Sequence, residues 1–220
     1  MGYTPVSYFP TDANLKVSSQ SQSVGKIYYK RDLSTKWQFA EYQETLTSAQ
    51  ARAKGETTVP VYALVTGFPV DKYDPTDSVI DLKSPEIISK YTAAGFTYSG
   101  ASLGTPTTPA PEAGVEEMTV TGDGTARGNV YYLRKLDCTY KVEYYLQNLS
   151  LTGYTLDSTL DNQKGIAGST VNTEPGLTGT VYKAYPGFTY DKTQTKPEVN
   201  PTLGLTTTIQ LYYTRNTDVK

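Results

Sequence analysis

Apolar and polar residues alternate along several short segments of this chain, most clearly over residues 205–214. There Ile209, Leu211 and Tyr213 fall on one face of an extended strand, and the residues between them, Tyr212 included, fall on the other face. Residues 139–148 alternate in the same way, with Val142 on the apolar face. This pattern predicts sheets with one packed face and one solvated face.

A pair of tyrosines followed by an arginine closes three such segments. They read IYYKRD (Ile27–Asp32), VYYLRK (Val130–Lys135) and LYYTRN (Leu211–Asn216). The alternation predicts that the second tyrosine of each pair is buried, that the first faces solvent and that the arginine reaches water at the strand end. The buried tyrosines would be Tyr29, Tyr132 and Tyr213, the exposed ones Tyr28, Tyr131 and Tyr212, and the arginines Arg31, Arg134 and Arg215.

Other markers repeat in step with the tyrosine pairs and indicate a repeated folding unit. A glycine-aromatic motif precedes each pair, and KWQFAEYQ (residues 36–43) aligns with KVEYYLQN (residues 141–148). The middle copy is longer because it contains SGASLGTPTTPAPEAG, which predicts an inserted surface loop. We therefore expect repeat units at residues 33–135 and 136–220, with residues 1–32 as the closing segment of a preceding unit packed on the next one.

The coarse secondary structure is mostly β. Strands are predicted near 24–31, 36–45, 57–66, 94–99, 116–121, 128–134, 139–148, 179–185 and 205–214. Asp123-Gly124 predicts a hairpin turn between two of them. Two short helices are expected, one opened by a capping box from Thr47 to Gln50 and one with Ser84 as N-cap and Pro85 in the first turn.

Composition weakens most catalytic and nucleic-acid interpretations. The chain has 220 residues, no histidine and one cysteine, Cys138, so an internal disulfide is impossible and the usual triads and zinc sites lack their parts. A net charge of -2 gives no basic surface for nucleic acid. No apolar run is long enough to cross a membrane, so membrane insertion is not expected. We expect a non-enzymatic protein without a cofactor.

The segments YKVEYYLQN, GFTYDK and LYYTRN resemble the tandem repeats of Gram-positive cell-wall adhesins, of the mucin-binding-protein (MucBP) type and the related internalin B-repeat type. The resemblance covers residues 139–216 well and residues 36–135 loosely. It implies small β-grasp-like units, mostly sheet with at most short helices, in the repeat region of a secreted surface protein. Such a protein would be extracellular and attached to the cell wall through parts outside this segment.

Exposed aromatic side chains are the candidate ligand-binding residues, because aromatic faces with polar tips can stack on sugar rings. They are Tyr28, Trp37, Tyr131, Tyr145 and Tyr212. The alternative is that outward aromatic pairs only stabilise the sheet, by about 0.2–1 kcal/mol each.

Three further chemical hypotheses are weaker. Asp71, Asp74 and Asp77 could share a calcium ion, but they lack the spacing of an EF-hand loop. An amide cross-link between Lys141 and Asn216 would need a buried carboxylate, for which Glu143 or Glu174 would have to serve. Glu116 and Glu117 are adjacent, so they would point to opposite faces of a strand and could not act together on a sugar.

The functional expectation is therefore a repeat region of a bacterial surface adhesin. It would act as a stalk, as a weak multivalent binder of a host glycoprotein or mucin, or as both, with neighbouring repeats of the same chain as further partners. The alternative from another class is a carbohydrate-binding module attached to a polysaccharide-active enzyme.

Overall fold

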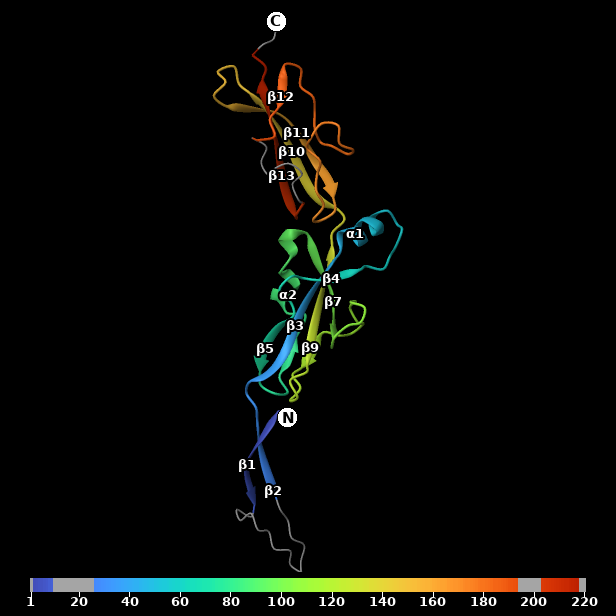
Figure 1. Ribbon diagram of the computed structural model, residues 1–220, viewed down its shortest axis with the longest axis vertical. Helices are drawn as coiled ribbons and strands as arrows, with labels where there is room; N and C mark the ends of the chain where they lie inside the picture. Colours follow the sequence, from blue (N-terminus) through green and yellow to red (C-terminus); the bar gives the residue numbers. More distant parts are fainter. Residues whose placement is uncertain (1, 10–25, 194–202, 218–220) are drawn as a thin grey trace, which may run out of the picture. The chain divides into compact units, whose positions relative to one another are not determined.

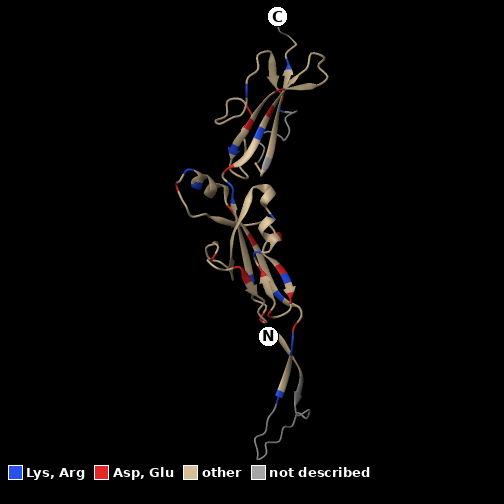
Figure 2. Ribbon diagram, turned by 180° about the vertical axis from the view of Figure 1, so that it is seen from behind, with Lys and Arg blue, Asp and Glu red and all other residues tan. Residues whose placement is uncertain are grey.

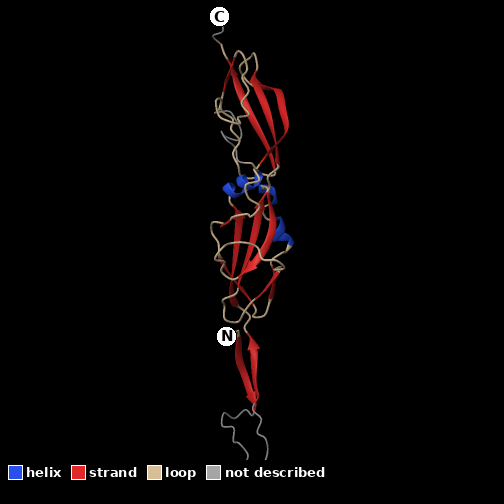
Figure 3. Ribbon diagram, turned by 90° about the vertical axis from the view of Figure 1, so that its right-hand side faces the viewer, coloured by secondary structure: helices blue, strands red, loops and turns tan. Residues whose placement is uncertain are grey.

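The computed structural model describes residues 2–9, 26–193 and 203–217, in which strands are the main regular secondary structure (Figures 1 and 3). The strands are β1 (Tyr3–Phe9), β2 (Lys26–Arg31), β3 (Thr35–Glu44), β4 (Tyr62–Leu64), β5 (Val70–Asp74), β6 (Val79–Asp81), β7 (Phe96–Leu103), β8 (Glu117–Thr119), β9 (Arg127–Arg134), β10 (Cys138–Gln147), β11 (Tyr154–Gly165), β12 (Phe188–Tyr190) and β13 (Thr206–Arg215). The helices are α1 (Leu46–Ala53), α2 (Pro85–Ser89) and the short 3-10 helix η1 (Thr92–Ala94). Within the described residues, none of the helices has the length and apolar character needed to traverse a membrane.

The chain divides into two compact units. Unit 1 comprises the described residues of Met1–Tyr42, Tyr62–Ile87 and Ser99–Tyr131, and unit 2 those of Gln43–Val61, Ile88–Tyr98 and Tyr132–Lys220. Strands β3, β7 and β9 contribute residues to both units. The repeat boundaries expected at residues 32 and 135 are not tested by this division and stay a prediction.

Unit 2 contains a four-stranded sheet in the order β11-β10-β13-β12. The central strands β10 and β13 run parallel, with Val142 opposite Ile209, and each has an antiparallel neighbour at the edge of the sheet. Parallel neighbours need a long crossover connection, and residues 148–205 between β10 and β13 include both edge strands.

One face of this sheet is packed, as the alternation predicts. Ile209, Leu211 and Tyr213 are fully buried in a cluster with Val142, and Leu146 packs against its margin. Val171 and Val181 enter the same cluster from the long connection between β11 and β12. The inward positions of β10 and β13 are thus confirmed, including the second tyrosine of the last pair.

The second sheet has the order β4-β3-β9-β7, with β5 also paired to β3. Tyr132 of β9 is fully buried, and its ring lies edge-on to those of Tyr91 and Tyr98, with centroids 4.8 and 6.3 Å away. The second tyrosine of the middle pair is therefore also a core residue. Val130, two positions earlier on the same face, is fully buried as predicted.

The first tyrosine pair behaves differently, and its predicted inward face is wrong. Strand β2 pairs with β1, and every side chain of β2 is exposed, including Ile27 at 59% and Tyr29 at 58%. Contacts to the rest of unit 1 come from the base of this strand pair, where Arg31 forms an ion pair with Asp77 and Asp32 bonds the backbone of Thr76. A two-stranded ribbon has no second layer to bury its apolar positions.

Several other predictions of local structure need correction. No strand forms at residues 179–185, and only Tyr62–Leu64 of the predicted strand 57–66 is extended. The longest strand, β11, was not predicted because its sequence, YTLDSTLDNQKG, is polar and mostly exposed at a sheet edge.

The turn and helix signals are partly right. Asp123-Gly124 forms a turn, with the amide of Gly124 bonded to the carbonyl of Thr121, but the flanking strands β8 and β9 belong to different sheets, so it is not a hairpin. Helix α1 is capped by Thr45, two residues before the predicted box, whereas α2 begins at Pro85 as expected.

Candidate ligand-binding face

The structure separates the five aromatic candidates into different environments. Tyr28 lies on the exposed ribbon formed by β1 and β2, at 53% exposure. Tyr145 and Tyr212 lie side by side on the outer face of unit 2, and both are half-buried. Trp37 and Tyr131 are buried, so the prediction that they face solvent is wrong.

Trp37 is excluded from any surface contact by its own packing. Its side chain is 5% exposed, its indole N–H donates to the carboxylate of Asp74 at 2.7 Å, and its ring packs edge-on against Phe39. The strand carrying it, β3, has buried positions on both faces, and β5 pairs with its edge.

Tyr131 is buried because the proline-rich insertion covers it. Its side chain is fully buried, and its hydroxyl lies 2.8 Å from that of Ser102 and takes a backbone hydrogen bond from Ala110 within the insertion. Burial raises the pKa of this hydroxyl. The insertion is therefore part of the packing of unit 1 and not only a surface loop.

On unit 2, three tyrosines and a leucine form a continuous aromatic patch that we call the tyrosine face. The rings of Tyr145 and Tyr212 are stacked, with centroids 5.0 Å apart and planes inclined by 15°. Tyr154 of the edge strand β11 meets Tyr212 edge-on, also at 5.0 Å. Leu156 lies opposite Tyr145 across the β10–β11 pair and is 47% exposed. Tyr154 and Leu156 were missed because β11 was not predicted.

Polar groups border the tyrosine face and fix its hydroxyls. Glu143 accepts hydrogen bonds from the Tyr145 hydroxyl and the Gln210 amide, both at 2.9 Å, and pairs with Lys141 at 2.6 Å. The Tyr212 hydroxyl donates to the other end of the Gln210 amide at 3.3 Å. Bonding to Lys141, then to Gln210, lowers the pKa of Glu143 to about 2, so this carboxylate is ionised at neutral pH and its charge is balanced.

Unit 1 contains the same aromatic arrangement in a buried form. Tyr42 and Tyr131 are stacked at 5.1 Å with planes inclined by 20°, and Tyr62 meets Tyr131 edge-on at 5.1 Å. Each edge-on tyrosine is followed two residues later by an exposed leucine, Leu64 in unit 1 and Leu156 in unit 2. A Tyr-x-Leu pattern after each opening strand was the signal that could have located these residues.

Closing contacts of the two repeated segments match as well. The amide of Lys135 donates to Gly95 and that of Asn216 to Gly187, both at 2.9 Å. In each case the preceding arginine lies 4.7 Å over the phenylalanine that follows the glycine, Arg134 over Phe96 and Arg215 over Phe188. These two arginines turn back onto the fold and do not simply extend into water, as the sequence had suggested.

These equivalences change the alignment of the opening strands. Arg134 donates its backbone amide to the side chain of Glu44, and Arg215 donates its amide to the side chain of Gln147, both at 3.0 Å. Glu44 therefore corresponds to Gln147, two positions away from the sequence alignment of residues 36–43 with 141–148. A shift of two residues preserves which face each side chain occupies, so the inward and outward positions predicted for β10 stay the same.

The Glu44 carboxylate anchors a buried network in unit 2. Glu44 is fully buried and receives a bidentate pair of hydrogen bonds from Arg52 of α1, at 3.0 and 2.8 Å. Arg134 donates to the Glu44 carbonyl at 2.6 Å and to the Ala167 carbonyl at 2.9 Å. The network links the end of β3, helix α1, the end of β9 and the loop after β11.

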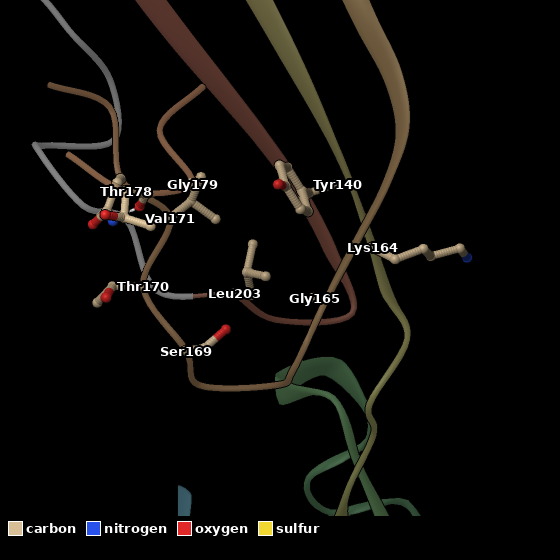
Figure 4. Close-up of a pocket in the computed structure, with 10 residues that line it drawn as sticks. Tyr140, Lys164, Gly165, Ser169, Thr170, Val171, Thr178, Gly179 and Leu203 are labelled. Atoms are coloured by element: carbon tan, nitrogen blue, oxygen red, sulfur yellow. Dashed lines mark hydrogen bonds between the residues drawn. The ribbon is translucent and has the colours of Figure 1, made fainter. Parts of the chain in front are cut away.

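Unit 2 also contains a pocket of about 280 Å³ (Figure 4). Its polar groups are mostly bonded within its own wall: Ser169 donates to the Ile166 carbonyl and Asn172 to the Thr178 carbonyl. Lys164 contributes to the lining, but its side chain points away from the other labelled residues and donates to Thr139 (Figure 4). The pocket therefore lacks convergent reactive or charged groups.

The weaker chemical hypotheses gain no geometric support. Asp71 is bonded to Lys36, Asp74 to Trp37 and Asp77 to Arg31. Over residues 2–9, 26–193 and 203–217, no three acidic, cysteine or histidine side chains gather as potential metal ligands.

Lys141 and Asn216 have separate partners. Lys141 pairs with Glu143, while the Asn216 side chain accepts from Thr189 at 2.7 Å. Of the two adjacent glutamates, Glu116 is paired with Lys83. Cys138 is buried and free, and burial raises the pKa of its thiol.

Charge offers no alternative site. Among the residues that the structure describes, lysine, arginine, aspartate and glutamate are interspersed on the ribbon of each unit, without a region of one sign (Figure 2). Comparison with known proteins adds no assignment, since the chain matches no protein-family model, no curated protein and no solved structure.

Proposed function

We propose that this chain is a non-enzymatic repeat region of a bacterial surface adhesin, built from β-grasp-like units that serve as a stalk and as weak multivalent binders of a host glycoprotein or mucin. The observation that supports the proposal best is the recurrence of one contact set. A glycine-to-closing-strand hydrogen bond, an arginine over a phenylalanine and a stacked tyrosine pair occur in both copies with nearly equal distances. Independent folds would have no reason to share this set.

The strand order of unit 2 favours a β-grasp-like unit. Its first and last strands, β10 and β13, lie parallel at the centre of the sheet, and the intervening β11 and β12 occupy the edges. Small units of this kind, repeated in series, suit a spacer because each unit is stabilised mainly by its own core and its immediate neighbours. The half-buried tyrosine face supplies a binding surface on the same scaffold.

Multivalent display tests the binding part of this proposal. We would compare the monomeric chain with a streptavidin-tetramerised chain for retention on mucin-coated and glycan-coated surfaces. Weak binding of the monomer and at least about 100-fold stronger retention of the tetramer are expected, because linked weak sites gain by effective concentration. Equal retention of the monomer and the tetramer would contradict the multivalent binding role. Equal retention of the tetramer on coated and uncoated surfaces would contradict it as well.

A second experiment tests whether the parent protein is located on the cell surface. Antibodies against the chain should label intact cells that produce the parent protein, and brief protease treatment of those cells should remove the label. Labelling only after the cells are permeabilised would contradict an adhesin.

A further inference from the structure

The proline-rich insertion of unit 1 shows what kind of segment fits a tyrosine face. Residues 104–114 have no helix or strand, and within them Pro106, Pro109 and Pro111 are half-buried while every threonine is exposed. The prolines are therefore the positions directed at the protein. Such a segment is stiff and extended before it docks, which reduces the entropy lost on binding.

Specific contacts hold this segment against unit 1, where the Ala110 backbone bonds the Tyr131 hydroxyl. Its amide at Glu112 donates to the Ala101 carbonyl at 2.8 Å, and its carbonyl at Gly104 accepts from the Asn129 side chain at 2.8 Å. Gly100 lies beneath Pro111, and a Cβ atom at Gly100 would be only 2.8 Å from the proline Cβ. Gly100 also has a φ of 143°, so both its conformation and its lack of a side chain allow the close approach.

The tyrosine face of unit 2 has the same arrangement of rings as the stacked tyrosines of unit 1, but its rings are more exposed to solvent. Tyr131 and Tyr42 are 0% and 5% exposed, whereas Tyr212 and Tyr145 at the matching positions are only half-buried. Gln210 occupies the position that Asn129 has in unit 1, two residues before the first tyrosine of the pair. The side chain that anchors the segment in unit 1 thus has an amide equivalent in unit 2.

We propose that the tyrosine face of unit 2, formed by Tyr145, Tyr154, Leu156 and Tyr212, binds an extended proline-rich peptide in the way that residues 104–114 cover the equivalent face of unit 1. Proline rings pack on the exposed parts of the tyrosine rings. The Gln210 amide keeps its bond to Glu143 and exchanges its longer contact with the Tyr145 hydroxyl, 3.4 Å, for a peptide carbonyl. The Lys141–Glu143 pair balances the charge at the rim, so neither a basic nor an acidic peptide is required. The inference rests on the proposed function in treating this face as a binding face, and it narrows the partner to the protein part of a glycoprotein.

The test peptide has the sequence of the insertion in unit 1. A synthetic peptide with the sequence of residues 103–114, LGTPTTPAPEAG, is titrated into the isotope-labelled full chain and followed by NMR chemical-shift changes. Shifts are expected for the backbone amides around Tyr154, Gln210 and Tyr212. A peptide with alanine at all three proline positions should bind at least about fivefold more weakly, because it loses both the ring contacts and the pre-organised conformation.

Matched variants locate the site. Tyr212→Ala should weaken binding at least about fivefold, as expected for loss of an aromatic residue at the centre of an interface. Tyr73→Ala, which removes an exposed tyrosine of unit 1 at 61% exposure, should leave binding unchanged. Circular dichroism checks that each variant is folded. Should Tyr212→Ala unfold, Gln210→Leu is tested in its place, since it keeps every ring and removes the amide donor.

The possible outcomes separate this inference from the proposed function. Absence of shifts on the tyrosine face, or equal affinity for the alanine peptide, overturns the peptide inference. Shifts produced on that face by soluble mucin oligosaccharides but not by the peptide also overturn it, while the proposed function stands. Failure of both the peptide and the tetramer on mucin-coated surfaces removes the binding role altogether.

Discussion

At the scale of single residues, the two tyrosines of each closing pair have different physical roles. Tyr213 is fully buried among the aromatic rings of the unit 2 core, with a centroid 4.9 Å from that of Tyr185. Tyr212 points to the opposite face and stacks on Tyr145. Adjacent positions of one strand thus serve the core and the surface respectively, because side chains alternate across a sheet.

Truncating these two residues should give different losses of stability. Tyr213→Ala is expected to reduce the free energy of unfolding by about 3–5 kcal/mol, since it leaves a cavity in a packed core. Tyr212→Ala should cost only about 1 kcal/mol, the scale of a cross-strand aromatic pair. Urea unfolding followed by circular dichroism measures both values. A larger loss for Tyr212→Ala than for Tyr213→Ala would show that the faces are reversed.

The Glu143 carboxylate should make stability depend on acid pH. Its pKa in the folded chain is about 2, below its ordinary value of 4.5, so the folded state binds its proton less readily than the unfolded state does. This contribution is complete above about pH 4.5 and is lost as the pH falls toward 2. Urea midpoints measured between pH 6 and about 2.5 should therefore fall less steeply for Glu143→Gln than for the unchanged chain. Glu117→Gln, on β8 of unit 1, serves as the control, and identical slopes for all three proteins would contradict the assignment.

At the scale of elements, the Glu44 network joins two strands, a helix and a loop that local sequence signals do not connect. Its members are separated by up to 123 positions, from Glu44 to Ala167, and the Glu44 carboxylate at its centre is fully buried. Burial lowers the pKa of Arg134, while the negative charge of Glu44 opposes this shift. The network is costly to interrupt because Arg52 and Arg134 would lose the negative charge that balances theirs in a partly buried site.

Removing the central carboxylate should therefore destabilise unit 2. Glu44→Ala is expected to reduce the free energy of unfolding by about 3–5 kcal/mol. Glu56→Ala, whose side chain is 60% exposed and pairs with Lys54, should change it by less than about 1 kcal/mol. Chemical denaturation of both variants provides the comparison. A near-neutral result for Glu44→Ala would show that solvent or another group compensates for the lost carboxylate.

At the scale of the whole molecule, the single thiol should take no part in assembly. Cys138 is 2% exposed, and burial raises the pKa of its thiol, which disfavours the reactive thiolate. We expect the folded chain to react slowly with Ellman's reagent and to form no disulfide-linked dimer under mild oxidation. In guanidinium chloride one thiol per chain should react rapidly. Fast reaction of the native protein would contradict the burial of this residue.

The sequence by itself determined the mostly-β class and the inward faces of β9, β10 and β13. Those features depend on local alternation, and a sheet with one apolar face must bury that face whatever surrounds it. The sequence also located the tyrosines of the candidate face on β10 and β13, since their outward direction follows from the same period of two.

Only the tertiary structure decided which outward tyrosines stay accessible. Tyr131 and Tyr212 occupy equivalent strand positions, yet the first is covered by a proline-rich insertion and the second is not fully covered. Likewise, Ile27 and Tyr29 lie on one face of β2, but within the described part of the chain no second layer of structure packs on that face and both are exposed. The polar strand β11 belongs to the sheet because it pairs with β10. Burial depends on what other parts of the chain lie against a face, and no local pattern records that.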